Sequence, residues 1–325
     1  MLLEFMGLLG GAIVIFILAE LALKRTIDLA EHWGWSGTFI GMTVLSIGTS
    51  IPEIMSHIVA SVQIVNDYSL LNTLSSLVVG ANIGSDIFQQ NFILPLVAII
   101  GVIVVHKKEL LSTMGELIFA AVLLWILTFG GFISRFEGAL LVLAYIGYLI
   151  YLRMGQKKQK LNPKNHLKKH QILFYSIFIF ISFLIMAVVT DFVLEMSKEL
   201  VNVIPISASF FGIIILGVAS ALPELSTALL ASFKKRSGIS AGVLIGSNIT
   251  NPLLALGLGA MISSYSIPNV VITYDLPIKI VTAGLIYYFL WRKEVLDKKR
   301  AVLLILLFIA YLIVRGIFFP ADFVV

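Results

Sequence analysis

Two glutamates stand in parts of the sequence where an acidic side chain is costly. Glu53 and Glu224 each follow a proline and lie about midway along long stretches of apolar and small residues. A charged side chain at the centre of a bilayer costs at least ~2.5 kcal/mol, and no lysine or arginine lies in a predicted helix core to balance either one. A divalent cation, several sodium ions or protons must therefore cancel their charge. The alternative, two neutral carboxyl groups that only hydrogen-bond between helices, gives no packing reason for the same Pro-Glu pair in two places.

Hydroxyl and amide side chains accompany both glutamates. The hydroxyls lie one turn before the glutamates or on the next apolar segment of each half, at Thr49, Ser50, Ser220, Ser85 and Ser247. A single Ser or Thr in a membrane helix ordinarily hydrogen-bonds to a neighbouring helix or to the backbone, but this clustering favours a role as cation ligands. Gln89 and Asn251 follow Ser85 and Ser247 by four residues, on the same helix face, and could supply a carbonyl oxygen or hold the glutamates. Two carboxylates with such neighbours form a hard oxygen cage, which suits Ca²⁺ and disfavours softer transition metals.

Asp86 and His57 are further polar residues of the same segments. Asp86 is one residue beyond Ser85 and about 100° around the helix, so contact with solvent or another helix fits it as well as contact with an ion. His57 follows Glu53 by four residues, and a place in a polar seam between helices fits it better than proton relay. Neither residue is included among the predicted ligands.

The residues around the two glutamates form an internal repeat. Segment 41–53 (GMTVLSIGTSIPE) corresponds to 212–224 (GIIILGVASALPE), and segment 80–87 (GANIGSDI) corresponds to 242–249 (GVLIGSNI). The glutamates are 171 residues apart and the Gly-Ser steps are 162 apart, so the spacer is nine residues longer in the first half. Two matches in the same order indicate a duplicated unit.

The composition identifies the environment of these residues. Of the 325 residues, 59% are apolar and 13% are charged, and the mean hydropathy is +1.02, whereas a soluble domain carries about 25% charged residues. A soluble protein is therefore excluded. The chain has no cysteine, so disulfides and thiolate metal sites are excluded. It also has no HExxH, Walker or GxGxxG motif, and we expect neither an enzyme, nor a cofactor, nor ATP-driven work on this chain alone.

Ten apolar segments are candidates for transmembrane helices, each of which needs about 20 mostly apolar residues. They cover residues 5–23, 36–65, 70–104, 113–131, 135–152, 171–196, 206–232, 239–264, 276–291 and 301–318. No small-residue cleavage site follows the first segment, so it is expected to be a retained helix rather than a signal peptide.

The basic residues predict the orientation of these helices, because lysine and arginine concentrate in cytoplasmic loops. With the N-terminus outside, the cytoplasmic loops hold 19 of the 23 basic residues, and the outer side keeps Arg135, Lys198, Lys279 and Arg315. Both termini are then extracellular, and the basic segment 153–170 is a cytoplasmic linker between halves 1–152 and 171–325. This asymmetry accounts for the net charge of +5 without a nucleic-acid partner. The expected partner is the lipid bilayer of the cell membrane.

In this topology the two repeats, 36–104 and 206–264, run in opposite directions through the membrane. The predicted fold class is an all-α integral membrane protein with ten transmembrane helices in two inverted five-helix repeats. Helices 2 and 7 are expected to be broken, because Pro52 and Pro223 each remove a backbone donor and clash with the preceding turn. Transporters with alternating access are commonly built in this way, with the substrate at the midplane where discontinuous helices meet.

The motifs resemble the two α-repeats of the cation/Ca²⁺ exchanger superfamily and are most similar to those of the prokaryotic sodium/calcium exchangers. The resemblance lies in Gly48-Thr-Ser-Ile-Pro-Glu53 with Gly84-Ser85, and in Ser220-Ala-Leu-Pro-Glu224 with Gly246-Ser-Asn-Ile249. It implies that Glu53 and Glu224 bind Ca²⁺ and share in sodium binding. It also implies that the hydroxyls named above, with carbonyls near Ser46 and Gly217, complete the sites, and that helices 1 and 6 slide across the rest to switch access.

Three positions depart from the family pattern. Ala221 removes one hydroxyl from the usual Gly-Thr-Ser of the second motif. Gln89 stands where the family usually has Asn, Asn251 where it has Asp or Asn, and Asp86 follows Ser85 where Asn is expected. The number of sodium sites, and even the driving ion, can therefore differ from the usual pattern.

The resulting prediction is a secondary active antiporter that exchanges Ca²⁺ for Na⁺ and functions as a monomer. A proton/Ca²⁺ antiporter on the same fold is the nearest alternative. A cation channel is an alternative of another class, which the inverted broken helices disfavour because a channel needs no counter-ion on the opposite side.

Overall fold

The computed structural model describes residues 2–32, 40–100, 107–155, 167–233 and 237–322. Parts of three predicted segments lie outside the described residues. These parts are 36–39 and 101–104 at the ends of the first repeat, 156–166 of the basic linker, and 323–325 of the predicted extracellular C-terminus.

The first half of the chain is helical with several irregular turns. Its elements are α1 (Leu2–His32), the π-helical η1 (Ile40–Leu45), α3 (Ser46–Thr49), α4 (Ile51–Asn66), the 3₁₀ turn η2 (Tyr68–Leu70), α5 (Leu71–Phe88), the π-helical η3 (Gln89–Ile93), α6 (Leu94–Ile100), α7 (Lys107–Thr128), β1 (Phe132–Ile133) and α8 (Arg135–Gly155). α1 extends nine residues past the predicted end at 23.

The second half repeats this sequence of regular and irregular elements. Its elements are α9 (Lys169–Val203), α10 (Ala208–Phe211), the π-helical η4 (Gly212–Leu216), α11 (Gly217–Ser220), α12 (Leu222–Phe233), α13 (Ser237–Thr250), the π-helical η5 (Asn251–Ala255), α14 (Leu256–Ser263), β2 (Tyr265–Ser266), the π-helical η6 (Val271–Asp275), α15 (Leu276–Lys293) and α16 (Lys298–Phe318). A π-turn precedes each short helix before the prolines, and a further π-turn begins at Gln89 and at Asn251. The duplicated sequence therefore repeats its backbone irregularities as well.

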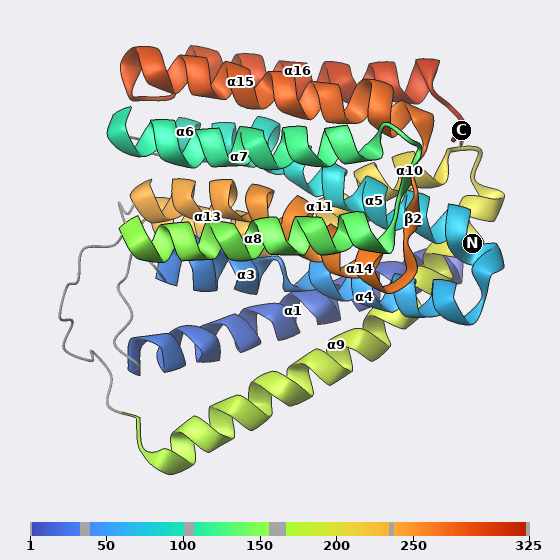
Figure 1. Ribbon diagram of the computed structural model, residues 1–325, viewed down its shortest axis with the longest axis horizontal. Helices are drawn as coiled ribbons and strands as arrows, with labels where there is room; N and C mark the ends of the chain where they lie inside the picture. Colours follow the sequence, from blue (N-terminus) through green and yellow to red (C-terminus); the bar gives the residue numbers. More distant parts are fainter. Residues whose placement is uncertain (1, 33–39, 101–106, 156–166, 234–236, 323–325) are drawn as a thin grey trace.

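One small feature departs from the all-α prediction. β1 and β2 form an antiparallel pair, with Phe132 opposite Ser266 and Ile133 opposite Tyr265. The pair joins the turn between α7 and α8 to the segment after α14 (Figure 1). It involves four residues, and the fold remains predominantly helical.

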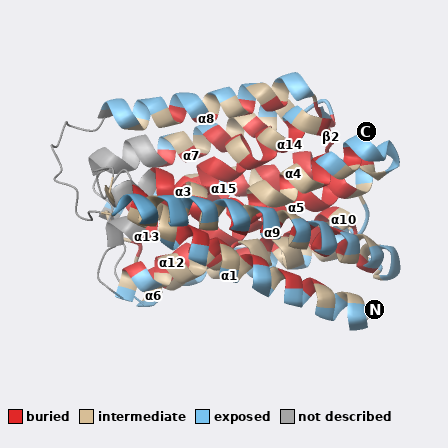
Figure 2. Ribbon diagram, turned by 90° about the horizontal axis from the view of Figure 1, so that it is seen from below, coloured by how far each residue is buried: buried red, intermediate tan, exposed pale blue. Residues whose placement is uncertain are grey.

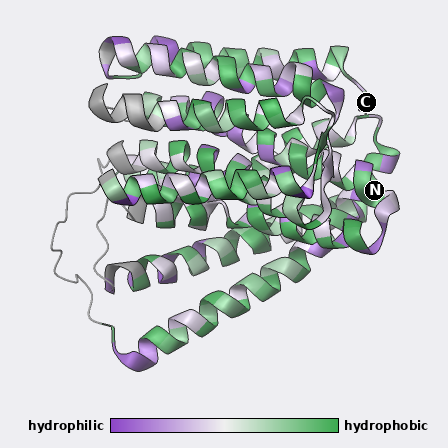
Figure 3. Ribbon diagram, in the orientation of Figure 1, coloured by the Kyte–Doolittle hydropathy of each residue, from purple (hydrophilic) through white to green (hydrophobic). Residues whose placement is uncertain are grey.

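The helices present apolar surfaces outward, as a lipid environment requires. By length and composition, six helices in the described ranges could cross a membrane, and the bent pair 208–220 and 222–233 adds a seventh. α9 has a mean hydropathy of 2.8 over its most apolar window, yet only 11% of that window is buried. Figures 2 and 3 show hydrophobic residues along the exposed outer helices. Soluble proteins rarely expose apolar surface on this scale, so the chain is an integral membrane protein.

The most buried helices bring the two halves together. α5 packs against α10, η4 and α11 of the second half, while α13 packs against η1 and α3 of the first half. α1 and α9 pack on each other at one edge of the molecule (Figure 1). Each broken segment therefore rests on a central helix that belongs to the other half.

Glycines allow these backbones to approach closely. A Cβ atom added at Gly84 of α5 would lie 2.5 Å from the Cα of Ile213, and one at Gly80 would lie 2.2 Å from the carbonyl oxygen of Ser209. On the opposite surface, a Cβ at Gly212 would lie 2.3 Å from the carbonyl oxygen of Leu77. Small residues four apart are the usual means of close helix packing in membranes.

We expect Gly84→Ala to destabilise the fold, because the added methyl group would overlap the η4 backbone rather than a movable side chain. Overpacking of this kind costs about 1–3 kcal/mol or more. Thermal unfolding in detergent should show a lower midpoint for this variant. Gly147→Ala on α8 is the matched control, because a Cβ at Gly147 meets nothing within 4 Å. Equal losses of stability in the two variants would contradict close packing at Gly84.

Candidate cation-binding site

Both Pro-Glu pairs of the internal repeat lie in the first turn of a helix that begins after a break. α3 ends at Thr49 and α4 begins at Ile51, while α11 ends at Ser220 and α12 begins at Leu222. The intervening residues have nearly the same backbone angles, φ −82° and ψ 8° at Ser50 and φ −81° and ψ 1° at Ala221. The second break bends the helix by 42°. The prolines cannot continue the preceding hydrogen-bond ladder, and each new helix N-terminus places a favourable dipole beside its glutamate.

The two breaks also use the same hydrogen bonds. Thr49 Oγ1 donates to the Ser46 carbonyl at 3.3 Å, and Ser220 Oγ donates to the Gly217 carbonyl at 3.2 Å. The backbone N–H of Ser50 donates to Ser46 at 3.1 Å, and that of Ala221 donates to Gly217 at 3.2 Å. The predicted carbonyls at Ser46 and Gly217 thus lie at equivalent places in the two halves, although each already accepts two bonds from its own segment.

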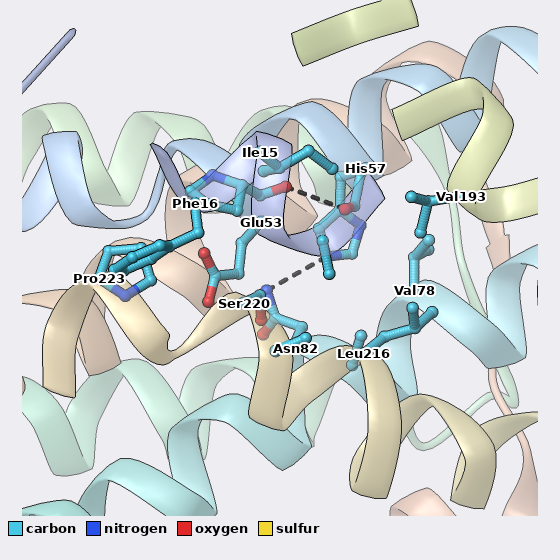
Figure 4. A pocket seen from close by; sticks show the side chains of 15 residues that line it. Ile15, Phe16, Glu53, His57, Val78, Asn82, Val193, Leu216, Ser220 and Pro223 are labelled. Carbon is cyan, nitrogen blue, oxygen red and sulfur yellow. Dashed lines mark hydrogen bonds between the residues drawn. The ribbon is translucent and has the colours of Figure 1, made fainter. Parts of the chain in front are cut away.

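Both glutamate carboxylates are buried within the protein. Glu53 is 2% exposed and Glu224 is 0% exposed. Glu53 lines a cavity of about 40 Å³ together with Asn82, Ser220 and Pro223. Figure 4 shows the Glu53 carboxylate beside Ser220 and Asn82 in this cavity. Most of the residues that line this cavity are apolar, and Glu224 is not one of them. Its volume has room for a few water molecules or a partly hydrated ion beside Glu53.

The region has many buried oxygen acceptors and few donors. Within the described residues, Ser85 Oγ donates to Glu53 Oε1 at 2.8 Å. In contrast, these buried oxygens make no hydrogen bond of ordinary geometry within the described residues: Glu53 Oε2, both carboxylate oxygens of Glu224, Asn82 Oδ1, Asn251 Oδ1 and Ser50 Oγ. Each buried acceptor without a donor costs about 1–3 kcal/mol, and charged groups cost more. A cation would satisfy several of these oxygens at once.

The donor set fits a hard cation. Ca²⁺ takes oxygen ligands from carboxylates and amide carbonyls, and both kinds occur here. Among the described residues, no group of three or more His, Asp or Glu side chains is arranged to hold a metal.

Gln89 links the two serines on the central helices. Its Nε2 donates to Ser85 Oγ at 3.0 Å, while its Oε1 accepts from Ser247 Oγ at 2.5 Å and from Asn248 Nδ2 at 3.0 Å. The side-chain carbonyl of Gln89 therefore already accepts hydrogen bonds from two protein donors. Gln89 holds Ser85, which in turn donates to Glu53, so it supports a glutamate indirectly.

Ser46 joins the first break to the opposite half. Its hydroxyl lies 2.7 Å from Thr250 Oγ1, and Thr250 is immediately before Asn251. The family resemblance implied a role only for the carbonyl near Ser46. This contact fixes the short helix α3 against the end of α13.

Two buried ion pairs correct the expectation that no basic residue lies in a helix core. Lys279 and Arg315 are both 0% exposed. Lys279 Nζ lies 2.5 Å from Asp86 Oδ2, and Arg315 Nε lies 3.3 Å from Asp275 Oδ1. The expectation was wrong for Lys279 because helical structure begins at Val271, five residues before the predicted start, and places Lys279 two turns inside.

The side-chain nitrogen of Asn251 donates to Asp86, the partner of Lys279, rather than to a glutamate. Its Nδ2 donates to Asp86 Oδ1 at 2.8 Å, and its Oδ1 has no donor among the described residues. The Asp275 and Lys279 spacing, i and i+4, would suggest a pair along one helix. Instead each residue pairs with a different helix, and sequence spacing alone gives no sign of this.

His57 lies in the expected polar seam. Its ring contacts the Tyr265 hydroxyl at 3.1 Å and Asn82 Nδ2 at 3.2 Å. Asn82 Nδ2 also donates to the backbone carbonyl of Asn251 at 2.9 Å. Figure 4 shows the contact between His57 and Asn82 beside the cavity.

Comparison with known proteins relates this arrangement to a family. The family model described as "Sodium/calcium exchanger protein" matches residues 3–154 and 174–316. The sodium/calcium exchanger MaX1 of Methanosarcina acetivorans is 24% identical over 351 residues, which covers 96% of this chain and 98% of the relative.

Two solved structures have the same fold. The structure of the sodium-calcium exchanger NCX_Mj soaked with Na⁺ and Ca²⁺ is 24% identical and has a TM-score of 0.65, covering 97% of this chain and 98% of that one. The H⁺/Ca²⁺ exchanger CAX is 16% identical with a TM-score of 0.77, covering 95% of this chain and 82% of that one.

Proposed function

This chain belongs to the sodium/calcium exchanger protein family, and on that premise we propose that it exchanges Ca²⁺ for Na⁺ by alternating access. The observation that carries the proposal is the pair of buried glutamates, three of whose carboxylate oxygens have no hydrogen-bond donor of ordinary geometry in the described ranges. Burial of a charge is tolerated when the charge is paired or bound to a metal. A transported cation would balance the carboxylate charge and would at the same time contact the oxygens that lack donors.

Charge balance explains why two kinds of cation would compete for this site. One Ca²⁺ or two Na⁺ cancels the two glutamate charges equally. Each uncompensated charge that crosses the membrane couples to the potential by about 2.3 kcal/mol per 100 mV. A site whose bound cations always cancel the two glutamate charges can therefore change its access from one side of the membrane to the other at small electrostatic cost. The empty, negatively charged site cannot.

We assign the ligands from both halves. Glu53 and Glu224 bind Ca²⁺, and Thr49, Ser50, Ser85, Ser220 and Ser247 supply hydroxyl oxygens as the two access states alternate. The carbonyls of Ser46 and Gly217 and the amide oxygen of Asn251 complete the set, while Gln89 fixes Ser85. The free acceptors at Ser50 and Asn251 support their inclusion.

The proposed topology has ten membrane-spanning segments in two inverted repeats, with both termini extracellular and the 153–170 linker cytoplasmic. The duplicated breaks and the reciprocal packing of α5 and α13 support the two-repeat organisation. α1 and α9, at one edge of the molecule, are the elements that would slide to change access. Contacts between the two halves within one chain support a functional monomer.

A proton/Ca²⁺ antiporter is the second candidate. One observation favours it: Ala221 offers no hydroxyl at the second break. This reduces the oxygens available for separate sodium sites, whereas two protons would need no such ligands.

Ca²⁺ uptake into proteoliposomes separates these candidates. With two sodium ions per Ca²⁺, a tenfold outward sodium gradient supplies about 2.8 kcal/mol and sustains about 100-fold accumulation of Ca²⁺. We expect accumulation to require this gradient and to collapse when an ionophore dissipates it.

The contrary results are distinct. Uptake driven by a pH gradient without sodium would support the proton antiporter. Passage of Ca²⁺ without any counter-ion, with continuous single-channel current in a planar bilayer, would indicate a channel and overturn antiport.

A further inference from the structure

Lys279 and Asp86 form a buried ion pair next to the proposed cation site. Lys279 on α15 and Asp86 on α5 are 193 residues apart in sequence, yet their charged groups approach to 2.5 Å with neither side chain exposed. A pair of charges in such surroundings carries a desolvation cost, and it gives weak evidence for stability alone. The pair therefore invites a functional explanation.

Two contacts tie this pair to the proposed ligands. Asp86 follows Ser85, the residue that donates to Glu53. Asp86 Oδ1 also accepts from Asn251 Nδ2, and Asn251 Oδ1 stays buried without a donor in the described part of the chain. Lys279 thus holds Asp86, and Asp86 orients the amide of a residue next to the site.

The charge of Asp86 lies beside the site, because Asp86 directly follows Ser85 and Ser85 donates to Glu53. Among the described residues, Arg315 is also a buried cation. It forms an ion pair with Asp275 and therefore does not neutralise Asp86 or the glutamates. Glu53, Glu224 and Asp86 carry three negative charges and Lys279 carries one positive charge, so two negative charges remain for mobile cations.

We propose that Lys279 is a fixed cation that takes the place of a third transported monovalent cation, so that two monovalent cations exchange for one Ca²⁺ without net charge movement. The inference rests on the proposed antiport and specifies its stoichiometry. A lysine ammonium is a compact charge with three donors on a flexible stem. It can neutralise a carboxylate as an alkali ion would, but its covalent attachment prevents it from being transported.

The membrane potential provides the direct test in proteoliposomes. A cycle that moves one net charge changes the equilibrium Ca²⁺ ratio by about 50-fold per 100 mV, whereas a neutral cycle leaves it unchanged. We expect the parent protein to be insensitive to a potassium–valinomycin potential, whichever monovalent gradient drives it. Lys279→Gln should recruit a third monovalent cation and become sensitive to the potential.

The double variant Asp86→Asn/Lys279→Gln removes both charges and keeps the net site charge. It should exchange without charge movement, as the parent does. Potential-dependent exchange by the parent would overturn the proposal, as would unchanged charge movement in an active Lys279→Gln protein. Arg315→Lys, which keeps a cation in the remote pair, is the control and should leave charge movement as in the parent.

A binding measurement tests the same idea without transport. Lys279→Ala leaves a space beside Asp86 that a small cation should fill. A ligand that binds the folded state raises its stability with concentration. The melting midpoint of purified Lys279→Ala should therefore rise as ammonium chloride replaces choline chloride, with no comparable rise in Asp86→Asn/Lys279→Ala. Equal responses of the two variants would overturn the fixed-cation role.

The two kinds of failure are distinguishable. If the parent carries no Ca²⁺ under sodium, proton or electrical gradients, the proposed antiport fails, and the ammonium response of Lys279→Ala still reports on the cation site. If the parent exchanges Ca²⁺ but moves one charge per cycle, antiport stands and the fixed-cation stoichiometry fails.

Discussion

Replacing Glu53 or Glu224 by glutamine is expected to abolish Ca²⁺ transport. Each substitution removes one of the two formal charges that balance Ca²⁺ while preserving side-chain shape. Loss of one partner from a buried charge interaction costs about 2–5 kcal/mol, which corresponds to about 30-fold to several-thousand-fold weaker binding. Initial rates of radioactive Ca²⁺ uptake in proteoliposomes measure this loss directly.

The same substitutions should leave the protein folded. A glutamine amide is cheaper to bury than a carboxylate, so the melting midpoint without Ca²⁺ should stay the same or rise. Added Ca²⁺ should stabilise the parent and have little effect on either variant. Glu195→Gln is the control, because Glu195 is a half-exposed partner of Lys198 on α9, away from the site. Near-parental flux in both glutamine variants would refute the site.

The sequence was sufficient to predict where two helices break and that a buried glutamate follows each break. A carboxylate after a proline within an apolar stretch is costly, and its recurrence 171 residues later pointed to a shared purpose. The helix breaks could be predicted as well, since proline must interrupt the ladder. The structure confirms breaks just before Pro52 and Pro223. These features depend on local chemistry and are written in consecutive residues.

The features that escaped prediction depend on helices that are distant in sequence. Hydropathy identifies Lys279 as a charge near a helix end, but it cannot tell that α15 places the ammonium against Asp86. Gln89 was expected to offer a carbonyl or hold a glutamate, whereas its amide contacts Ser85 and also Ser247, which lies 158 residues beyond Gln89. Pairing between helices is set by packing, and one sequence contains no direct record of it.

The second buried pair predicts a large effect on stability. Asp275 accepts from Tyr311 Oη at 2.9 Å and from Arg315 Nε at 3.3 Å. Arg315→Met would leave a fully buried carboxylate with the tyrosine as its remaining donor among these groups. Breaking a buried pair by removing one partner costs about 3–5 kcal/mol. Unfolding in a denaturing detergent titration should show this loss.

The double variant Asp275→Asn/Arg315→Met distinguishes a stranded charge from lost packing. It removes both charges, and neutral replacements of a buried pair are often close to harmless, so most of the stability should return. Arg25→Met is the control, because the Arg25–Asp28 pair is partly exposed at 3.7 Å and such pairs contribute about 0–1 kcal/mol. If the double variant is as unstable as Arg315→Met, the other contacts of the guanidinium, with Ser209 and the Phe319 carbonyl, stabilise the fold instead. Ca²⁺ exchange by the double variant should keep the parental ion coupling, since this pair neutralises itself and leaves the charge at Glu53 and Glu224 unchanged.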